Sequence, residues 1–261
     1  LSDSTQSAAI IHDNDHPKSV AFGISWEGEL SQIDLESGEV RSLGSTGFTN
    51  LNSLTTSSQS KLLTAANLDS PRGEIIEIDP TTGNSSVLYD FDNDFGGVKA
   101  SIRGMAYAPD GSLYVIHNAS GNGTIGADEL YRVSPTTGTT QRLFVLGAED
   151  LQSLAISPDS GLLYSFDMGT GSLLEIDPST GSVKAIGGAG STNIQGLAFD
   201  NSGVLYASGT TSYAIDLNTG ELTPVPELGY FRGLTFVDEN LVIEKGAAAV
   251  VSISASILSE E

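Results

Sequence analysis

The sequence predicts an all-β fold of the β-propeller class, and three observations support this prediction. A phrase with the pattern Asp-x-x-x-Gly, preceded by Ile or Val, recurs five times along the 261 residues, with Ser in place of Asp in one copy. Short apolar strand-like runs flank each copy, and no segment keeps the 3.6-residue apolar period of a helix. Units of about 40 residues with four short antiparallel strands are typical of propellers. A β-sandwich is the alternative, but it does not predict internal copies of one phrase.

The repeated phrase has the composition of a tight turn. Its copies start at Asp34, Asp79, Ser134, Asp177 and Asp216, and they end at Gly38, Gly83, Gly138, Gly181 and Gly220. A carboxylate at the first position can accept hydrogen bonds from backbone N–H groups of the turn, and Gly tolerates the left-handed conformation at the last. We therefore expect these residues to be scaffold, located in outer turns.

The positions at which the phrase recurs divide the chain into repeating units. Strands are expected at residues 19–24, 30–34 and 40–43, followed by four complete four-stranded units and a partial last unit of three strands. The complete units span residues 51–89, 102–146, 151–186 and 194–225, and the partial unit spans residues 231–253. Four complete units, together with the strands before and after them, predict six four-stranded blades in a single propeller domain over residues 18–261.

An N-terminal tail, residues 1–17, carries one apolar run that reads as a strand, Ala8–Ile11. It can supply the outer strand of the last blade or the innermost strand of the first, so that the chain termini close the ring and leave no exposed edge. It can also enter a neighbouring molecule whose last blade is incomplete, which would join chains head to tail.

The chain resembles exported bacterial β-propellers of the WD40/YVTN-like superfamily, in which L-Y-x-I-D-P-x-T-G phrases mark the third strand and its turn. The resemblance covers about residues 19–253. The Gly-His and Trp-Asp signals of true WD40 blades are absent, and Trp26 is the only tryptophan. The resemblance implies a fold and no specific activity.

Composition excludes several classes of function. The net charge of −22, from 33 acidic and 11 basic residues, opposes binding to nucleic acid and to anionic membranes. No apolar run is long enough to span a bilayer, so we expect no membrane insertion. The absence of cysteine excludes disulfides and thiolate sites. This composition is compatible with an extracellular or periplasmic protein whose signal peptide has been removed.

Two columns of side chains are expected to line the channel face, where propellers bind ligands. The first lies just inside each innermost strand and comprises Asn52, Arg103, Gln152, Gln195 and Arg232. The second lies at the end of each second strand and comprises Asn67, His117, Asp167, Gly209 and Lys245. The alternative is that both columns form a hydrogen-bonded plug of the channel.

The residues disfavour a catalytic interpretation. Six-bladed lactonases place Glu, Asn and Asp around the axis to bind a divalent metal, whereas the first column here contains two arginines and no carboxylate. Arginines suit an anionic or carbohydrate ligand. No nucleophile motif is present, and only a pairing of His117 with Asp167 would offer acid–base chemistry, so no catalytic residue is assigned.

Metal binding is predicted at one acidic cluster. Asp90, Asp92 and Asp94 alternate as in calcium loops, although Phe95 and Ser101 replace the Gly and Glu of an EF-hand, so Ca²⁺ is the one cofactor considered. The run His12–His16 lies in the tail and is expected to be solvated. Acceptor sequences for glycosylation begin at Asn84, Asn118 and Asn122.

The leading hypothesis is a non-enzymatic binding module for a carbohydrate, an anionic small molecule or a protein. One alternative is a fibre or surface subunit joined through the N-terminal strand, so the chain would be a monomer or a homopolymer. The second alternative is a metal-assisted hydrolase of the lactonase kind.

Overall fold

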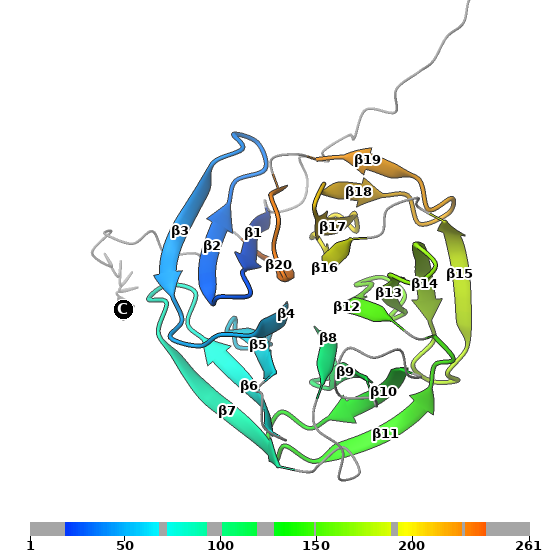
Figure 1. Ribbon diagram of the computed structural model, residues 1–261, viewed down its shortest axis with the longest axis horizontal. Coiled ribbons are helices and arrows are strands. Elements are labelled where there is room, and N and C mark those ends of the chain that lie inside the picture. The colour runs from blue at the N-terminus through cyan, green and yellow to red at the C-terminus, as the bar shows by residue number, and fades with distance from the viewer. Residues whose placement is uncertain are drawn as a thin grey trace, which may run out of the picture.

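The structure is a computed structural model that describes residues 19–67, 72–92, 101–118, 128–148, 150–188, 193–225 and 228–238. These residues form a ring of five four-stranded antiparallel sheets, the blades of a propeller (Figure 1). None of the described residues belongs to a helix with the length and apolar character needed to cross a bilayer.

Four blades are continuous in sequence, and each runs from an innermost to an outermost strand. The first contains β4 (Leu51–Thr56), β5 (Leu62–Asn67), β6 (Arg72–Ile78) and β7 (Ser85–Asp92). The second contains β8 (Ile102–Tyr107), β9 (Leu113–Asn118), β10 (Asp128–Val133) and β11 (Thr140–Val145). The third contains β12 (Leu151–Ile156), β13 (Leu163–Asp167), β14 (Ser172–Ile176) and β15 (Val183–Gly188). The fourth contains β16 (Ile194–Phe199), β17 (Leu205–Gly209), β18 (Tyr213–Ile215) and β19 (Leu222–Pro224).

The fifth blade joins the first and the last strands of the described residues and is called the closing blade here. It contains β20 (Gly233–Asp238) innermost, then β1 (Ser19–Ile24), β2 (Glu29–Ile33) and β3 (Val40–Ser45). Strand β20 pairs antiparallel with β1 along its whole length, and Gly233 lies opposite Ile24.

The prediction of six blades is therefore wrong, because it counted the strands at the front and at the back of the chain as two separate blades. The chain instead combines three strands from the front with one from the back, which completes one blade and leaves no incomplete blade among the described residues. Among the described residues, the ring is closed by the pairing of the last strand, β20, with the first, β1. The run Ala8–Ile11 lies outside the described residues.

Within the described residues, the hydrophobic core comprises five clusters, each packed between neighbouring blades. Between the first and second blades, for example, Leu63 and Ile75 pack with Met105 and Val115. Burying one such side chain fully stabilises the fold by about 1.5–3 kcal/mol. Because these clusters lie between the blades, the residues at the channel axis are not needed to form the core.

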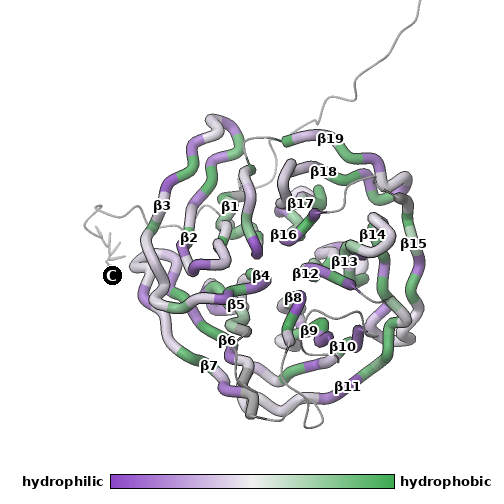
Figure 2. The backbone as a smooth tube through the Cα atoms, in the orientation of Figure 1, coloured by the Kyte–Doolittle hydropathy of each residue, from purple (hydrophilic) through white to green (hydrophobic). Residues whose placement is uncertain are grey.

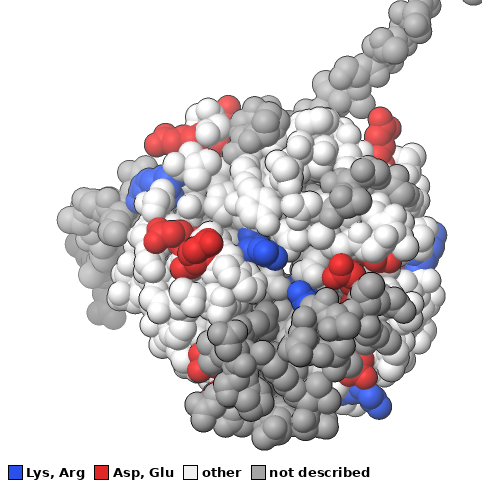
Figure 3. All heavy atoms as spheres, viewed as in Figure 1, with Lys and Arg blue, Asp and Glu red and all other residues white. Residues whose placement is uncertain are grey.

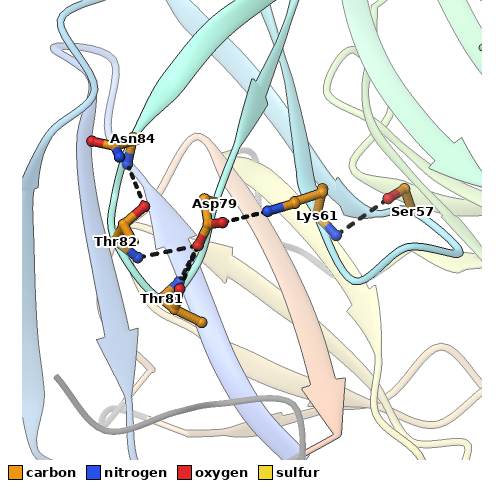
Figure 4. A network of polar contacts seen from close by, with 6 residues as sticks. All are labelled: Ser57, Lys61, Asp79, Thr81, Thr82 and Asn84. Carbon is orange, nitrogen blue, oxygen red and sulfur yellow. Dashed lines mark hydrogen bonds and ion pairs between the residues drawn. The ribbon is translucent and has the colours of Figure 1, made fainter. Parts of the chain in front are cut away.

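The repeated phrase forms outer turns, as predicted. Figure 4 shows the copy in the first blade, where Asp79 Oδ1 accepts hydrogen bonds from the backbone N–H groups of Thr81 (2.9 Å) and Thr82 (3.1 Å). The Lys61 ammonium forms an ion pair with the same carboxylate and, with these hydrogen bonds, holds the pKa of Asp79 well below its usual range. Gly83 closes the turn at a φ of +72°. The phrase is therefore scaffold.

Candidate functional site

The predicted first column lies at the start of the five innermost strands. Asn52, Arg103, Gln152 and Gln195 are the second residues of β4, β8, β12 and β16, and Arg232 directly precedes β20. We call these five residues the polar ring. Figure 2 shows hydrophilic segments on innermost strands around the axis, and Figure 3 shows basic side chains near the middle of this face with acidic ones on either side.

Backbone irregularities follow directly after the polar ring residues. The pairing register shifts after Asn52 in β4 and after Gln152 in β12, and the next residues, Ser53 and Ser153, have φ values of +65° and +61°. A Cβ atom added to Gly104 would lie 2.4 Å from the carbonyl carbon of Ser153, so neighbouring innermost strands approach backbone to backbone. Serines in the left-handed conformation cost conformational free energy, and bulges change the direction of side chains. Both features cluster at functional sites.

On one side of the polar ring, the side chains satisfy one another. The Arg232 guanidinium donates a hydrogen bond from Nη1 to Gln195 Oε1 (2.6 Å), and Gln195 Nε2 donates to Asn193 Oδ1 (3.0 Å). The same guanidinium lies 4.8 Å from the ring centroid of Trp26, in the geometry of a cation–π contact. Gln195 and Arg232 therefore have partners within the protein.

On the other side, hydrogen-bonding capacity is left unused. Asn52 donates from Nδ2 to the carbonyl oxygen of Ile102 (3.4 Å), and Gln152 donates from Nε2 to Asp150 Oδ1 (3.0 Å). Within the described part of the chain, Asn52 Oδ1, Gln152 Oε1 and Arg103 Nε are buried and have no hydrogen-bond partner. Each such atom costs about 1–3 kcal/mol of desolvation. Two buried acceptors and one buried donor of the polar ring thus have unused hydrogen-bonding capacity.

A buried carboxylate beside the polar ring was missed by the sequence analysis. Asp128 accepts hydrogen bonds from Asn118 Nδ2 (2.9 Å) and from the backbone N–H of Leu151 (2.7 Å), and so it links the second and third blades. Burial raises the pKa of Asp128 to about 6, although these hydrogen bonds and the charge of Arg103 act in the opposite direction. The repeat gave no signal, because Gly73 takes the equivalent place in the first blade.

The second column was predicted with an error of register. His117, Asp167 and Gly209 lie opposite the first residues of β8, β12 and β16, but Ala66, not Asn67, lies opposite the first residue of β4. Asn67 is therefore one position further along its strand, in the place equivalent to Asn118.

The fifth position of the second column also differs from the prediction. Because β1 is the second strand of the closing blade, this position falls just after Ile24, at Ser25 and Trp26. The predicted residue, Lys245, lies outside the described residues. The miscount of blades thus hid Trp26, which is 37% exposed and lies next to the polar ring.

The structure gives His117 and Asp167 separate surroundings. Asp167 accepts hydrogen bonds from the N–H of Gly169 (2.9 Å) and the hydroxyl of Thr170 (2.8 Å), so it caps the turn that follows its own strand. His117 is fully buried in the second blade, with Nδ1 3.7 Å from Glu129 Oε2. This arrangement favours a structural role for Asp167 over an acid–base pair.

The predicted calcium loop falls largely on residues that the structure does not describe. Asp90 is exposed on the outer strand β7, whereas the side chain of Asp92 and the whole of Asp94 are outside the described set, as is the run His12–His16. Among the residues that are described, no group of three or more His, Asp or Glu is arranged to hold a metal ion. In the polar ring itself, guanidinium and amide groups do not match the oxygen-rich set that Ca²⁺ prefers.

At the opposite end of the channel, the last residues of the innermost strands enclose a cavity of about 150 Å³. Most of its lining residues have apolar side chains, Leu154 and Phe236 among them, although polar atoms contribute more of the surface that faces the pocket. Its hydroxyl groups are engaged: Thr56 Oγ1 and Thr235 Oγ1 are 2.9 Å apart, and Thr55 Oγ1 accepts the N–H of Tyr107 (3.0 Å). We call this the apolar end and the region of the polar ring the polar end.

Comparisons with known proteins agree with the fold. The sequence model of a family described as "Repeat of unknown function (DUF6923)" matches residues 93–225. A search of curated protein sequences found no match. The fold-level resemblance to propellers is confirmed by solved structures.

Three of these structures illustrate the range of similar folds. A gluconolactonase from Xanthomonas campestris is 20% identical, with a TM-score of 0.54 over 80% of this chain and 76% of that chain. A calcium-binding protein, regucalcin, from Agrobacterium tumefaciens is 18% identical, with a TM-score of 0.50 over 84% and 76%. A chain of a nidogen/laminin complex is 12% identical, with a TM-score of 0.54 over 84% and 98%. At such identities, the similarity shows the fold alone.

Proposed function

Since this chain belongs to the repeat family DUF6923, whose description assigns no activity, we propose a function from the geometry of the site. The protein is a non-enzymatic binding module that takes a hydroxyl-bearing small molecule or glycan at the polar end of its channel. One observation carries this proposal: the polar ring buries two acceptors and one donor without partners, on three consecutive blades.

The desolvation cost of these three buried atoms supports a ligand-binding site over a hydrogen-bonded plug of the channel. A plug is stabilised when its polar groups satisfy one another, as Gln195 and Arg232 do. Asn52 and Gln152 are only 1% and 5% exposed, so water has little access to their oxygens. A ligand that supplies the missing partners would recover the desolvation cost on binding.

Calorimetric titration tests the proposal with neutral saccharides, uronic acids and inorganic phosphate as probes. Replacing Arg103 by Ala should weaken binding about tenfold or more, because it removes a charged, buried donor. Arg41→Ala is the matched control, since Arg41 is exposed on the outer strand β3 and should leave affinity unchanged. The proposal fails if no probe binds, or if both variants bind like the wild type.

A metal-assisted hydrolase is the second candidate, favoured by the fold shared with gluconolactonases and by the buried carboxylate of Asp128 next to Arg103. Turnover of a lactone panel with and without Ca²⁺ tests it, with Asp128→Asn as the variant expected to lose activity. Calcium itself is tested by the melting temperature, which should rise with Ca²⁺ and fall with chelator. An absence of turnover together with an unchanged melting temperature at millimolar calcium would remove this candidate.

Location and assembly follow from the same proposal. A binding module with this excess of negative charge suits the extracellular or periplasmic space. Fibre assembly needs an incomplete blade as acceptor, and the closing blade already has four strands. We therefore expect a monomer by size-exclusion chromatography, both for the whole chain and after deletion of residues 1–17. Concentration-dependent polymers that this deletion abolishes would restore the fibre hypothesis.

A further inference from the structure

Trp26 lies at the polar end of the channel, in the turn between β1 and β2. Its carbonyl oxygen accepts the N–H of Leu51 (3.2 Å), so its backbone is fixed one residue away from Asn52 of the polar ring. Its side chain remains 37% exposed, which is unusual for the one tryptophan of a chain with 261 residues. A partly exposed indole therefore lies next to Arg232 and one residue from Asn52 in the polar ring, whose three buried atoms lack partners among the described residues.

Arg232 is already engaged by other groups of the protein, which leaves Arg103 as the cation of the polar ring that can bind a ligand. Its guanidinium is held between the Trp26 ring, at 4.8 Å, and Gln195 Oε1, at 2.6 Å. These contacts fix Arg232 and the orientation of Trp26 relative to the polar ring. Arg103 is the cation with a buried N–H group, Nε, that lacks an acceptor in the described residues.

The pattern of unused groups limits the chemistry of the ligand. Asn52 Oδ1 and Gln152 Oε1 are acceptors and need donors from the ligand, whereas Arg103 Nε needs an acceptor. The orientation of the Gln152 amide is fixed, because its nitrogen donates to the carboxylate of Asp150. A fully ionised phosphate, sulfate or carboxylate offers acceptors only, and it would also meet the negative field of the protein. Hydroxyl groups serve both roles.

We propose that the polar end is a saccharide subsite in which Trp26 stacks on one face of a pyranose ring while its hydroxyl groups bond to Asn52, Gln152 and Arg103. A pyranose has a C–H face that packs on an aromatic ring and an equatorial rim of groups that both donate and accept. Aromatic side chains with a few convergent polar groups are typical of small-molecule sites. This inference rests on the proposed binding function and names its ligand class.

The fluorescence of the single tryptophan tests the inference directly, in parallel with calorimetry on the full chain. The probes are soluble oligosaccharides of glucose, N-acetylglucosamine and xylose, with sorbitol as an acyclic polyol that has hydroxyl groups but no ring face. We expect a saturable change in Trp26 emission for at least one oligosaccharide, with the same Kd in calorimetry, and no binding of sorbitol.

Two variants separate stacking from a structural effect of Trp26. Trp26→Ala should weaken oligosaccharide binding about tenfold, whereas Trp26→Phe, which keeps an aromatic face, should weaken it only about threefold. If calorimetry detects binding while the tryptophan emission and the affinity of Trp26→Ala are unchanged, the stacking role is wrong and the proposed binding function stands. If only inorganic phosphate binds, the ligand class is wrong. If no probe binds in either measurement, the proposed function fails together with the inference.

Discussion

The two ends of the channel are formed by the same five strands, yet they differ in whether their buried hydrogen-bonding groups have partners. At the apolar end, the hydroxyls of Thr55, Thr56 and Thr235 all have partners, and most of the other lining residues have apolar side chains. At the polar end, Asn52, Arg103 and Gln152 each keep one buried atom without a partner among the described residues. The difference indicates that the apolar end contributes stability and that the polar end keeps unused hydrogen-bonding capacity at a cost in stability, as the proposed binding function requires.

Backbone geometry follows the same division. The left-handed serines, Ser53 and Ser153, and the register shifts lie next to the polar ring, whereas the residues at the apolar end pair regularly, as Thr56 does with Leu62. Backbone strain and unsatisfied polar groups occur together at this end. Their coincidence argues for a functional site more strongly than either feature alone, because a channel with a purely structural role would need neither.

The largest expected effect is at the apolar end. Phe236 lines its cavity, is 7% exposed and packs against Tyr206 with ring centroids 5.1 Å apart. Phe236→Ala should lower the free energy of unfolding by about 3–5 kcal/mol. Val145→Ala, on the exposed face of β11, is the control and should change it by less than about 0.5 kcal/mol. Chemical denaturation measures both, and a loss in Phe236→Ala no larger than in the control would contradict the stabilising role of this end.

A pH-dependent effect of intermediate size is expected at the polar end. The pKa of Asp128 is raised to about 6 in the folded state, so in the window from about pH 4 to 6 the folded chain binds a proton that the unfolded chain has released. Stability therefore falls as pH rises through this window, by about 3 kcal/mol for a shift of two pKa units. The groups that face Asp128 are Asn118, the N–H of Leu151, Arg103 and Asp150.

Asp128→Asn should remove this dependence, because the amide keeps an acceptor for Leu151 and never ionises. The measured quantity is the difference in unfolding free energy between wild type and variant across this pH range. Asp110→Asn is the control with the opposite sign, since hydrogen bonds from Ser112 lower the pKa of Asp110 and its stabilisation is lost as pH falls. If the difference in unfolding free energy between the wild type and Asp128→Asn is the same at every pH, Asp128 is not a buried titrating group.

The sequence predicted the scaffold and the equivalent positions of the first-column residues, because the repeated turn phrase recurs at the same place in each blade. Asn52, Arg103, Gln152, Gln195 and Arg232 follow that repeat and occupy equivalent places. The number of blades was wrong, because periodicity does not show which distant strands pair. Pairing of β20 with β1 depends on the closed ring and has no local signal.

The rest of the site depends on contacts between blades that no repeat encodes. Asp128 has no counterpart in the first blade, where Gly73 stands. Trp26 became part of the site only when β1 was placed beside β20. Asn67 was misplaced because the end of a strand cannot be fixed to one residue from its apolar pattern alone.

The most direct test of the central claim compares two glutamines at equivalent positions of neighbouring blades. Gln195 has both ends of its amide bonded, to Arg232 and Asn193, whereas Gln152 leaves Oε1 without a partner in the described residues. Each is replaced by Met, which is similar in volume and apolar, and the free energy of unfolding is measured in urea.

We predict that Gln195→Met loses about 2 kcal/mol, because it leaves two polar groups unpaired. We expect Gln152→Met to stay within about 1 kcal/mol of the wild type or to exceed it, because the loss of its one hydrogen bond to Asp150 is offset by removal of the unpaired Oε1. This outcome would show that the polar end keeps unused hydrogen-bonding capacity at a cost in stability. If Gln152→Met is destabilised as much as Gln195→Met, the polar ring is a satisfied plug and the claim is wrong.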